Sequence, residues 1–581
     1  MTVSDGAIAA PAVATYDLAV VGGGLAGLTS AVRACELGLR AIVLEQGDGP
    51  QYPCNSRQSG GILHIAFHDP YREPAELTDL MARVTGGQAR PDIATALANN
   101  AARFIGWLRD QDVRLMRFDP REMYRWGMAP PRALKGGIDW AGRGPDRALA
   151  QLVERLLHLG GVLQLRSRAT DLIIENGRCV GVRGELDGME TSWRASACLI
   201  ADGGFQSDRA LFETHIAPDF NAVFQRGART GRGDGLKMAL AAGAALTDTN
   251  RFYGHLLCAD ARSNDDLWPF PQLDALATTG IVVNGYGMRV ADEGRTGVFL
   301  TNALASVPAD PGLFVIFDHA IWEGPGKSDR VGPNPWVEKG GGTIYRADTL
   351  SELAVLIGVP AEAFMETVGT YNHAMASGTL AQLPIARSEK IQPFAISQAP
   401  YMAIRAIPGI TYTMGGIAID DHAQVLRSDA TPIPGLFAAG AATGGLEGGS
   451  DAGYIGGLIK AGTFGLLAAE RLAALMGKPM ISNIEETRSA MHNMSAPASP
   501  ANTAEPQGLA RFPTLRATLR HGRTAAFAAA VLGFGATLLI TWQPLGPLSL
   551  ILAAALGAML CFAILCFTEL VRLITELLMP D

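Results

Sequence analysis

Residues 20–28, VVGGGLAGL, decide the fold of this chain, because they join an apolar strand to a helix through a turn of three glycines. The pattern predicts a strand over residues 16–21, a helix over about 25–37 and a second strand over 41–45. A strand, a glycine turn, a helix and a second strand form the first unit of a doubly wound sheet. The segment therefore predicts an α/β, Rossmann-like domain.

The glycines of this turn have the spacing of a dinucleotide-binding motif. Gly22, Gly24 and Gly27 form G-x-G-x-x-G, which permits the tight turn, the approach of a pyrophosphate and the contact of helix with strand. Glu45 ends the second strand and can accept hydrogen bonds from ribose hydroxyls. A dinucleotide site is favoured over an accidental glycine turn, because strand, helix and acid all stand where the mechanism needs them.

The composition excludes some partners and indicates another. The net charge of −8 argues against nucleic-acid binding, and 48% hydrophobic residues with a mean hydropathy of +0.16 are apolar for a soluble enzyme. The seven cysteines lack C-x-x-C pairs and metal-ligand spacing, so we expect reduced thiols and no metal site. Contact with membrane lipid is expected.

The C-terminal region carries the apolar sequence. Between Arg523 and Glu569 lie 45 uncharged residues, and one straight helix of that length would be about 68 Å long, against a hydrocarbon core of about 30 Å. Residues 543–547, QPLGP, supply a break, so we predict a transmembrane hairpin with spans at 524–542 and about 548–568. A buried helical pair in a soluble core is the alternative.

Flanking charge gives this hairpin an orientation. Four arginines and no acid lie in residues 511–523, which favours a cytoplasmic flank, and the N-terminus shows no secretion signal. We expect an inner (cytoplasmic) membrane protein with two spans and its catalytic domain in the cytoplasm. A quinone or a membrane electron-transfer protein is the expected redox partner.

Further motifs select the cofactor and indicate a family. No second G-x-G-x-x-G of this quality follows, so one bound nucleotide must perform the chemistry, which favours FAD. The chain resembles the FAD-binding subunit family of fumarate reductases and succinate dehydrogenases, which includes tricarballylate, urocanate and 3-oxosteroid oxidoreductases. The resemblance covers about residues 15–475 and rests on motifs in the family's order: VVGGGLAGL, DGGF at 202–205, GRGDG at 231–235, GMRVADEGR at 287–295, TMGG at 413–416 and PGLFAAG at 434–440.

The resemblance implies a set of FAD contacts. The glycine-rich residues 444–457 are expected to pass along the flavin, and the helix 458–473 to direct its positive N-terminus at the isoalloxazine; a flexible surface linker is the alternative. The predicted cofactor residues are Gly22, Gly24, Leu25, Ala26, Gly27, Glu45, Gln46, Ser59, Gly60, Gly61, Asp202, Gly203, Gly204, Gly440, Gly456 and Gly457.

The chain departs from the family at the substrate. Fumarate reductases carry histidines before TMGG and an arginine in the glycine segment, whereas this chain has Thr411 and Tyr412 before the first and acids such as Glu447 and Asp451, with Ser450, in the second. Repulsion from these acids would disfavour a small dicarboxylate.

Three residues are candidates for catalysis by this resemblance. Arg295 lies close to the proton-shuttling arginine, Tyr412 corresponds to a tyrosine of the steroid branch that supplies a proton or polarises a carbonyl, and His255 matches a substrate-contacting histidine. A solvated or hydrogen-bonded structural group is the alternative for each. Cys54 lies near the position of covalent flavin attachment, but a small buried apolar residue is the favoured interpretation.

These observations predict the domain organisation and the function. The FAD-binding domain is expected at 15–245 and 400–477, an inserted α+β capping domain at 246–399, a linker at 478–510 and the basic flank with its membrane anchor at 511–581. We expect FAD-dependent hydride transfer at a C–C bond beside a carbonyl or carboxylate of a small molecule. The alternatives are a 3-ketosteroid dehydrogenase-like enzyme with an apolar substrate and a membrane-anchored flavin-binding module without turnover.

Overall fold

The computed structural model describes residues 16–308, 312–327 and 330–478, with a few short stretches between 554 and 567. Residues 1–482 and 483–581 form two separate units. The predicted linker, the basic flank and almost all of the predicted hairpin lie outside the described residues. Within the described part of the chain, no helix combines the length and the apolar character needed to cross a bilayer.

The first sheet is built around the glycine turn. Its strands follow the order β15, β16, β8, β1, β2, β5, and the five from β16 to β5 run parallel. The bounds are β1 Tyr16–Val21, β2 Ala41–Leu44, β5 Val162–Gln164, β8 Met189–Ile200, β15 Gln424–Leu426 and β16 Pro432–Ala438. Apolar, buried strands such as β1 and β2 are typical of a parallel sheet covered on both faces.

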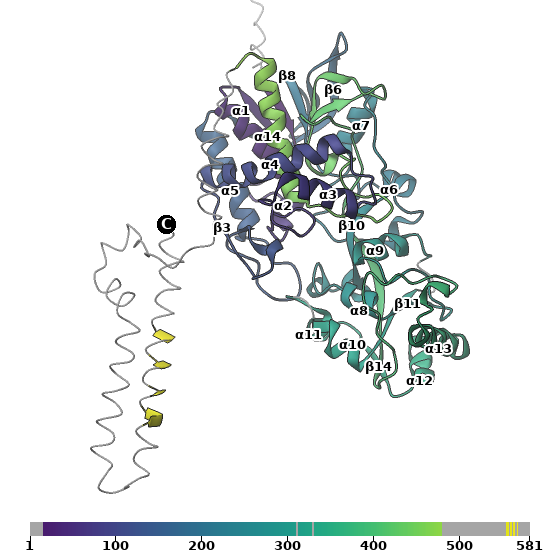
Figure 1. Ribbon diagram of the computed structural model, residues 1–581. Coiled ribbons are helices and arrows are strands. Elements are labelled where there is room, and N and C mark those ends of the chain that lie inside the picture. The colour runs from purple at the N-terminus through teal and green to yellow at the C-terminus, as the bar shows by residue number, and fades with distance from the viewer. Residues whose placement is uncertain are drawn as a thin grey trace, which may run out of the picture. The chain divides into compact units, whose positions relative to one another are not determined.

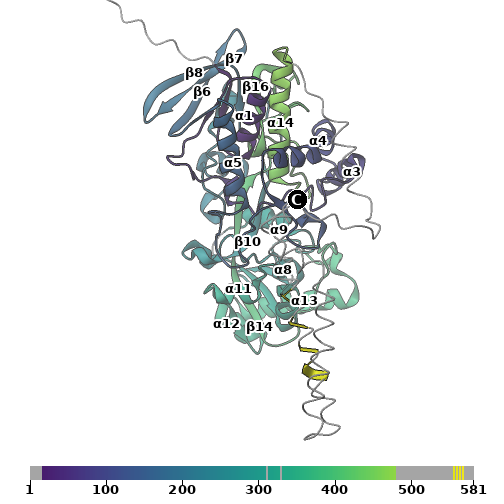
Figure 2. The same ribbon diagram turned by 90° about the vertical axis from the view of Figure 1, so that its left-hand side faces the viewer.

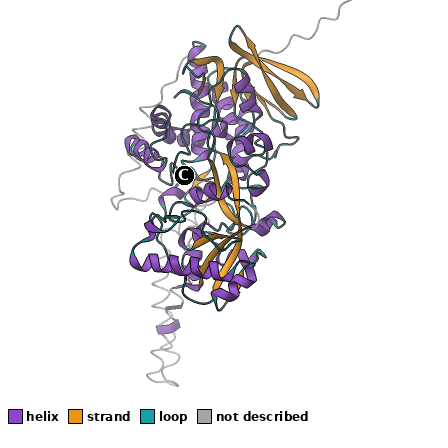
Figure 3. Cartoon of the chain, turned by 90° about the vertical axis from the view of Figure 1, so that its right-hand side faces the viewer, coloured by secondary structure: helices purple, strands orange, loops and turns teal. Residues whose placement is uncertain are grey.

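A three-stranded extension continues this sheet. Strands β6 (Ser167–Glu175) and β7 (Arg178–Leu186) form an antiparallel hairpin, and β7 pairs with the first part of β8. Asn176 and Gly177 both have positive φ, as a type I′ turn requires. The three long strands project from the rest of the first sheet in Figure 3.

Helices cover the first sheet. Helix α1 (Leu25–Glu36) packs against α14 (Gly457–Leu475), and the two lie side by side in Figure 2. Thus a helix near residue 30 and one near residue 465 share one core, which confirms both predicted helices. The other helices before the second sheet are α2 Asn55–Gln58, α3 Pro74–Val84, α4 Pro91–Asp110, α5 Gly144–His158, α6 Arg209–His215 and α7 Asp234–Ala241.

The second sheet is antiparallel along its main path, β10, β14, β12, β11. Its strands are β9 Phe224–Gln225, β10 Phe252–Cys258, β11 Ile281–Asn284, β12 Leu313–Asp318, β13 Tyr345–Ala347 and β14 Tyr401–Thr413. The helices of this region are α8 Asp274–Thr279, α9 Gly297–Ala305, α10 His319–Glu323, α11 Pro333–Lys339, α12 Leu350–Ile357 and α13 Ala361–Ser377. Figure 1 shows these elements grouped apart from α1, α14 and β8.

The chain returns from the second sheet later than residue 400, the boundary that the sequence suggests. Strand β14 pairs with both β10 and β12, so residues 401–413 belong to the second sheet. The reason is the length of β14: its thirteen residues pair with β12 and β13 at one end and with β10 at the other. The chain re-enters the first sheet only at β15, which begins at Gln424.

Candidate functional site

A cavity of about 680 Å³ lies between the glycine turn of the first sheet and the strands β10 and β14 of the second. One part of its wall consists of the residues after β1, β2 and β8. Another part contains polar side chains from β10, β14 and α8. The carboxyl ends of parallel strands are where open α/β sheets bind their ligands.

The dinucleotide end of the cavity has the features that FAD requires. Gly24 is the N-cap of α1, where the hydroxyl of Ser56 accepts from the N–H of Leu25 at 3.1 Å, and Gly22 has a φ of +101° that favours glycine. A Cβ on Gly27 would lie 2.0 Å from the carbonyl oxygen of Gly22, so this third glycine allows helix and strand to touch. The exposed backbone and the positive helix end fit a pyrophosphate.

Glu45 is buried at this end and already engaged. Its Oε2 accepts a hydrogen bond from the backbone N–H of Gly23 at 2.8 Å, and its Oε1 accepts one from Gly47 at 2.9 Å. Burial raises the pKa of Glu45, and these N–H groups oppose the shift. Each carboxylate oxygen has a further lone pair for a ribose hydroxyl.

Asp202 follows the parallel part of β8 and carries an unpartnered oxygen. Its Oδ2 accepts a hydrogen bond from the N–H of Gly235 at 2.7 Å, whereas its Oδ1 is enclosed without a hydrogen-bond partner. Burial raises the pKa of Asp202 to about 7. An orphaned acceptor in a cavity wall fits a ligand that carries hydroxyl groups, as FAD does.

Thirteen of the sixteen predicted cofactor residues line the cavity; the other three are Gly27, Gly204 and Gly456. Each of the three lies behind the cavity wall, at a point where the glycine backbone packs closely against a neighbouring residue. A Cβ on Gly204 would lie 2.3 Å from Oγ1 of Thr413, and one on Gly456 would lie 2.3 Å from the carbonyl oxygen of His64. These glycines serve packing around the cavity.

The glycine segment 444–457 is folded against the core, and the acid in its centre is neutralised. Nζ of Lys460 lies 2.6 Å from Oε2 of Glu447, and the N–H groups of Ile455 and Gly456 donate to Oε1. Burial alone raises the pKa of Glu447, but Lys460 and the N–H groups lower it below its usual value. Asp451 is likewise paired, with Arg295 and Lys390. Both acids therefore have cationic partners, which weakens the expected repulsion of substrate anions.

Tyr412 lines the cavity, but its hydroxyl is committed to the same acid. It donates to Glu447, with O–O distances of 3.0 Å and 3.2 Å. Burial and the nearby Glu447 raise the pKa of Tyr412 well above its usual value. Tyr412 therefore presents its ring, rather than a free hydroxyl hydrogen, to the cavity.

His255 belongs to a chain of hydrogen-bonded groups on the cavity wall. Its Nδ1 lies 2.5 Å from Oδ2 of Asp274, and its Nε2 lies 3.0 Å from the hydroxyl of Tyr253. A carboxylate only accepts, so Nδ1 carries a hydrogen, and in the tautomer with this hydrogen alone Nε2 accepts a hydrogen bond from the Tyr253 hydroxyl. Burial raises the pKa of Tyr253 to about 12, and the charge of Arg226 opposes this shift.

The β register explains why these groups meet. Tyr253 and His255 are two residues apart on β10, so their side chains share a face, and Tyr253 pairs with Tyr412 across β14. The Tyr253 ring centroid lies 5.4 Å from that of Tyr412 and 4.0 Å from that of Tyr454, on which it stacks. Three tyrosines thus form one wall of the cavity.

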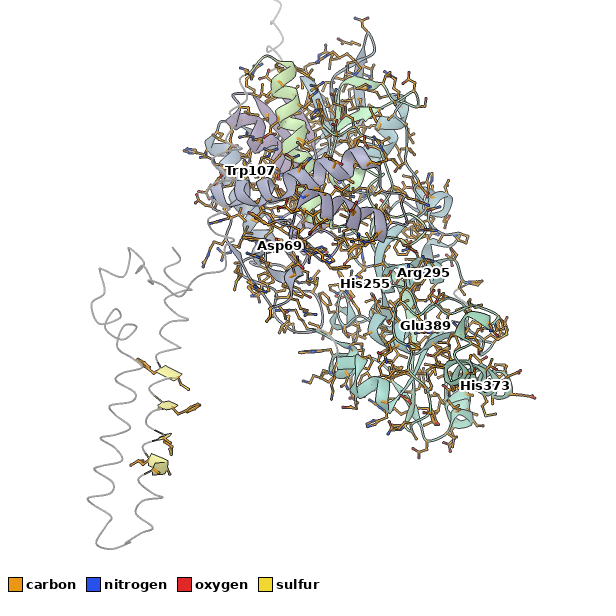
Figure 4. The ribbon with its side chains drawn as sticks, viewed as in Figure 1. Asp69, Trp107, His255, Arg295, His373 and Glu389 are labelled. Carbon is orange, nitrogen blue, oxygen red and sulfur yellow. The ribbon has the colours of Figure 1, made fainter. Side chains whose placement is uncertain are left out.

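Arg295 does not line the cavity. It forms an ion pair with Asp451, and its guanidinium carbon lies 3.6 Å from the centroid of the Phe299 ring. Burial lowers its pKa. Figure 4 labels both Arg295, which shortly precedes α9, and His255, which lies on β10. Its predicted proton-shuttling role stays a prediction, since its cationic group is engaged with the glycine segment.

Cys54 lines the cavity as a thiol, and burial raises its pKa to about 11. A thiol with a raised pKa is a poor nucleophile, which agrees with the interpretation of Cys54 as a small apolar residue.

Among the polar residues of the cavity wall that sequence reasoning missed are Tyr253, Asp274, Arg132 and Arg226. Tyr253 could have been found, because it precedes His255 by two residues in an alternating strand. Asp274 begins α8, and the two arginines lie in irregular segments, so no local pattern distinguishes them from surface residues.

Residues 17–454 match the FAD binding domain family. The chain is 28% identical over 475 residues to a fumarate reductase (cytochrome) of Shewanella frigidimarina, which covers 79% of this chain and 77% of that protein. It is 25% identical over 573 residues to a 3-oxosteroid 1-dehydrogenase of Mycolicibacterium smegmatis, covering 79% and 97%. A crystal structure of 3-ketosteroid Δ1-dehydrogenase from Sterolibacterium denitrificans superimposes with a TM-score of 0.63 at 21% identity, covering 79% of this chain and all of that one.

This match defines a flavoprotein class. The chain belongs to the FAD-binding fumarate reductase and succinate dehydrogenase flavoprotein family, as the resemblance of its motifs predicts. It is an FAD-dependent oxidoreductase that acts on CH–CH groups of small molecules. The residues at the dinucleotide end of the cavity are suited to hold the FAD.

Proposed function

We propose that this enzyme dehydrogenates or reduces a C–C bond next to a carbonyl or carboxylate, with Tyr253 as the group that transfers the proton. The observation that carries the proposal is the hydrogen-bonded series from Asp274 through His255 to Tyr253 on the cavity wall. Bound FAD supplies hydride transfer. The side chains must supply the accompanying proton transfer.

The series suits proton transfer in either direction. When Tyr253 takes a proton from the substrate carbon, its own hydroxyl proton passes to Nε2 of His255, and Asp274 stabilises the resulting imidazolium. In the reduction, Tyr253 gives its proton to the substrate carbon and regains one from protonated His255. A carboxylate behind a histidine is a recurring means of fixing its tautomer and orientation.

Tyr253 is favoured over the predicted Tyr412 for this role. The hydroxyl of Tyr412 is held by a carboxylate that is itself paired with Lys460, so proton release there would place two anions side by side. Tyr253 instead faces a neutral acceptor and lies near the positive charge of Arg226, which opposes the effect of burial on its pKa.

The test is flavin bleaching or reoxidation with a panel of ketones, enones and carboxylates. Tyr253→Phe should retain bound FAD while lowering the rate of flavin bleaching or reoxidation by about 10²- to 10⁴-fold. Tyr286→Phe is a matched control, because Tyr286 is exposed and lies outside the cavity wall. A Tyr253→Phe enzyme with the wild-type rate would refute the proposed role of Tyr253.

We further propose that the C-terminal segment anchors the enzyme in the cytoplasmic membrane, with the catalytic domain in the cytoplasm, and that a quinone exchanges electrons with the FAD. The support is the 45-residue uncharged stretch, long enough for two spans, and the arginines that precede it.

Deleting residues 511–581 tests the anchor. The truncated enzyme should leave the membrane fraction and keep activity with a soluble redox dye, but lose quinone-linked activity. Membrane fractionation alone distinguishes the truncated enzyme from the full-length enzyme, so the four arginines of 511–523 need not be substituted. Retention of the truncated enzyme in membranes, or unchanged quinone activity, would contradict the proposal.

A further inference from the structure

Two arginines in the cavity wall lack an anionic partner. Arg132 lies in the segment after β4 (Gly127–Met128), and Arg226 directly follows β9. Among the described residues, neither guanidinium forms an ion pair. Nη2 of Arg132 is fully enclosed and has no hydrogen-bond partner. A buried cation without a counter-ion is costly, so its retention calls for an explanation.

Neutral groups accept hydrogen bonds from only some of the N–H donors of the two arginines. Arg226 donates to Oγ1 of Thr411 at 2.7 Å and to the carbonyl oxygen of Pro269. Arg132 donates through Nε to the carbonyl oxygen of Asp139 at 2.9 Å and through Nη1 to that of Gln58 at 3.4 Å. A guanidinium has five N–H donors, so each arginine retains donors for a ligand.

The neighbouring carboxylates are already paired elsewhere. The side chain of Asp139 is bound to Arg143 at 2.8 Å and accepts the N–H of Ala133. Asp274 accepts from His255 and from the backbone of Leu256, and its charge acts to raise the pKa of Arg226 without an ion pair between them. In the part of the chain that the structure describes, neither acid forms an ion pair with the two guanidinium groups.

One aromatic ring lies beside both cations. The guanidinium carbons of Arg132 and Arg226 lie 5.3 Å and 5.8 Å from the centroid of the Phe270 ring. A ring face attracts cations without neutralising them. Burial lowers the pKa of both arginines, that of Arg132 to about 10. The guanidinium group of arginine nevertheless stays protonated in proteins. The pair thus forms a positive, partly enclosed surface in the cavity.

We propose that Arg132 and Arg226 form an anion-binding subsite, and that the substrate carries a carboxylate besides the group that activates its C–C bond. This inference rests on the proposed function. Arg226 contacts Thr411, the neighbour of Tyr412, so the subsite adjoins the tyrosine wall. A planar carboxylate matches the fork of N–H donors on a guanidinium. The two arginines supply positive charge for a substrate carboxylate, which no motif of the sequence indicated.

Paired ligands test this inference on the FAD-loaded enzyme. The probes are 4-oxocyclohexanecarboxylate and the neutral 4-methylcyclohexanone, with binding followed by the change in the flavin absorption spectrum. The wild type should bind the carboxylate about 10- to 100-fold more tightly, the value of one or two charge-assisted hydrogen bonds. Arg226→Met and Arg132→Met should each reduce this preference without changing the affinity for the neutral ketone.

Arg229→Met is the matched control. Arg229 lies three residues from Arg226 but is exposed and outside the cavity wall, and its removal should leave the preference unchanged. Flavin content and midpoint potential, measured on every variant, separate a substrate site from a cofactor site. Loss of FAD, or an altered potential with an unchanged ligand preference, would assign the arginines to the cofactor and overturn the inference.

Equal affinity of the wild type for the two probes, or no binding of either, would also overturn it. The proposed function has its own readout, because Tyr253→Phe is judged by the rate of flavin bleaching with any active substrate. A neutral ketone that is turned over through Tyr253, with no effect of either arginine, would leave the proposed function standing and remove the subsite alone.

Discussion

Lys460 and Glu447 form an ion pair at 2.6 Å in which both side chains are almost completely removed from solvent. The two residues lie on opposite sides of the turn into α14, so the pair holds the glycine segment against the start of this helix. The hydroxyl of Tyr412 and two backbone N–H groups occupy the other positions around the carboxylate. Full satisfaction of a buried carboxylate is the condition for tolerating one.

Lys460→Met should destabilise the protein by about 3–5 kcal/mol, because it leaves a buried carboxylate without its cation. Urea unfolding of the FAD-loaded protein measures the loss. Lys390→Met, at an exposed lysine, should change the free energy of unfolding by no more than about 0.5 kcal/mol. The double variant Lys460→Met with Glu447→Gln should recover part of the loss. A single variant as stable as the wild type would show that the pair contributes nothing.

Gly27→Ala should abolish FAD binding or prevent folding. The added Cβ would lie 2.0 Å from the carbonyl oxygen of Gly22 and 2.9 Å from the Val20 side chain, so helix α1 would have to move away from β1. The ratio of flavin to protein absorbance measures the effect. Gly369→Ala in α13 is the control, because nothing lies within 4 Å of the added atom. Normal flavin content in Gly27→Ala would contradict the close packing.

Asp202 should make the FAD-free protein less stable as the pH rises. Burial raises its pKa to about 7, above the value of about 4 in an unfolded chain. Between these values the folded protein binds more protons than the unfolded one, so stability is greatest below about pH 4 and is lost up to about pH 7. Asp202→Asn removes this contribution.

Thermal unfolding of wild-type and Asp202→Asn apoprotein across this range isolates the effect from other titrating groups. The stability difference between the two proteins should change in the variant's favour as the pH rises from 4 to 7 and stay constant above. A stability difference that does not change between pH 4 and pH 7 would mean that Asp202 of the folded apoprotein is charged across this whole range.

Asp274→Asn should lower kcat while leaving KM and flavin content nearly unchanged, because the carboxylate holds His255 without being expected to touch the substrate. The amide oxygen of the introduced Asn can still accept a hydrogen bond from Nδ1–H of His255. The amide carries no charge, however, so it does not stabilise the imidazolium of His255. Asp274→Glu, which restores the charge, should recover part of the rate. Steady-state kinetics with any substrate from the panel separates the effect on kcat from the effect on KM. A change in KM alone would assign Asp274 a structural role.

Much of the FAD end of the cavity could be predicted from the sequence, since thirteen of the sixteen predicted cofactor residues line it. Its strands, turn and helix follow one another along the chain, and the roles of Gly22, Gly24 and Gly27 depend on local backbone geometry that a sequence pattern records. The substrate end could be predicted only in part. His255 and Tyr412 were found through the resemblance, whereas Asp274 and Glu447, their carboxylate partners, come from other segments of the chain.

The sequence by itself determined the Rossmann-like fold, the FAD cofactor and the glycine segment near α14, because each depends on short-range periodicity and backbone freedom. The tertiary structure decided which charges are neutralised and which groups can exchange protons. Lys460 neutralises Glu447 through the turn into α14, Tyr253 meets Tyr412 through the register of β10 and β14, and Arg132 approaches Arg226 across 94 positions of the chain. Electrostatic partnership depends on distance in space, and spacing along the chain does not fix that distance.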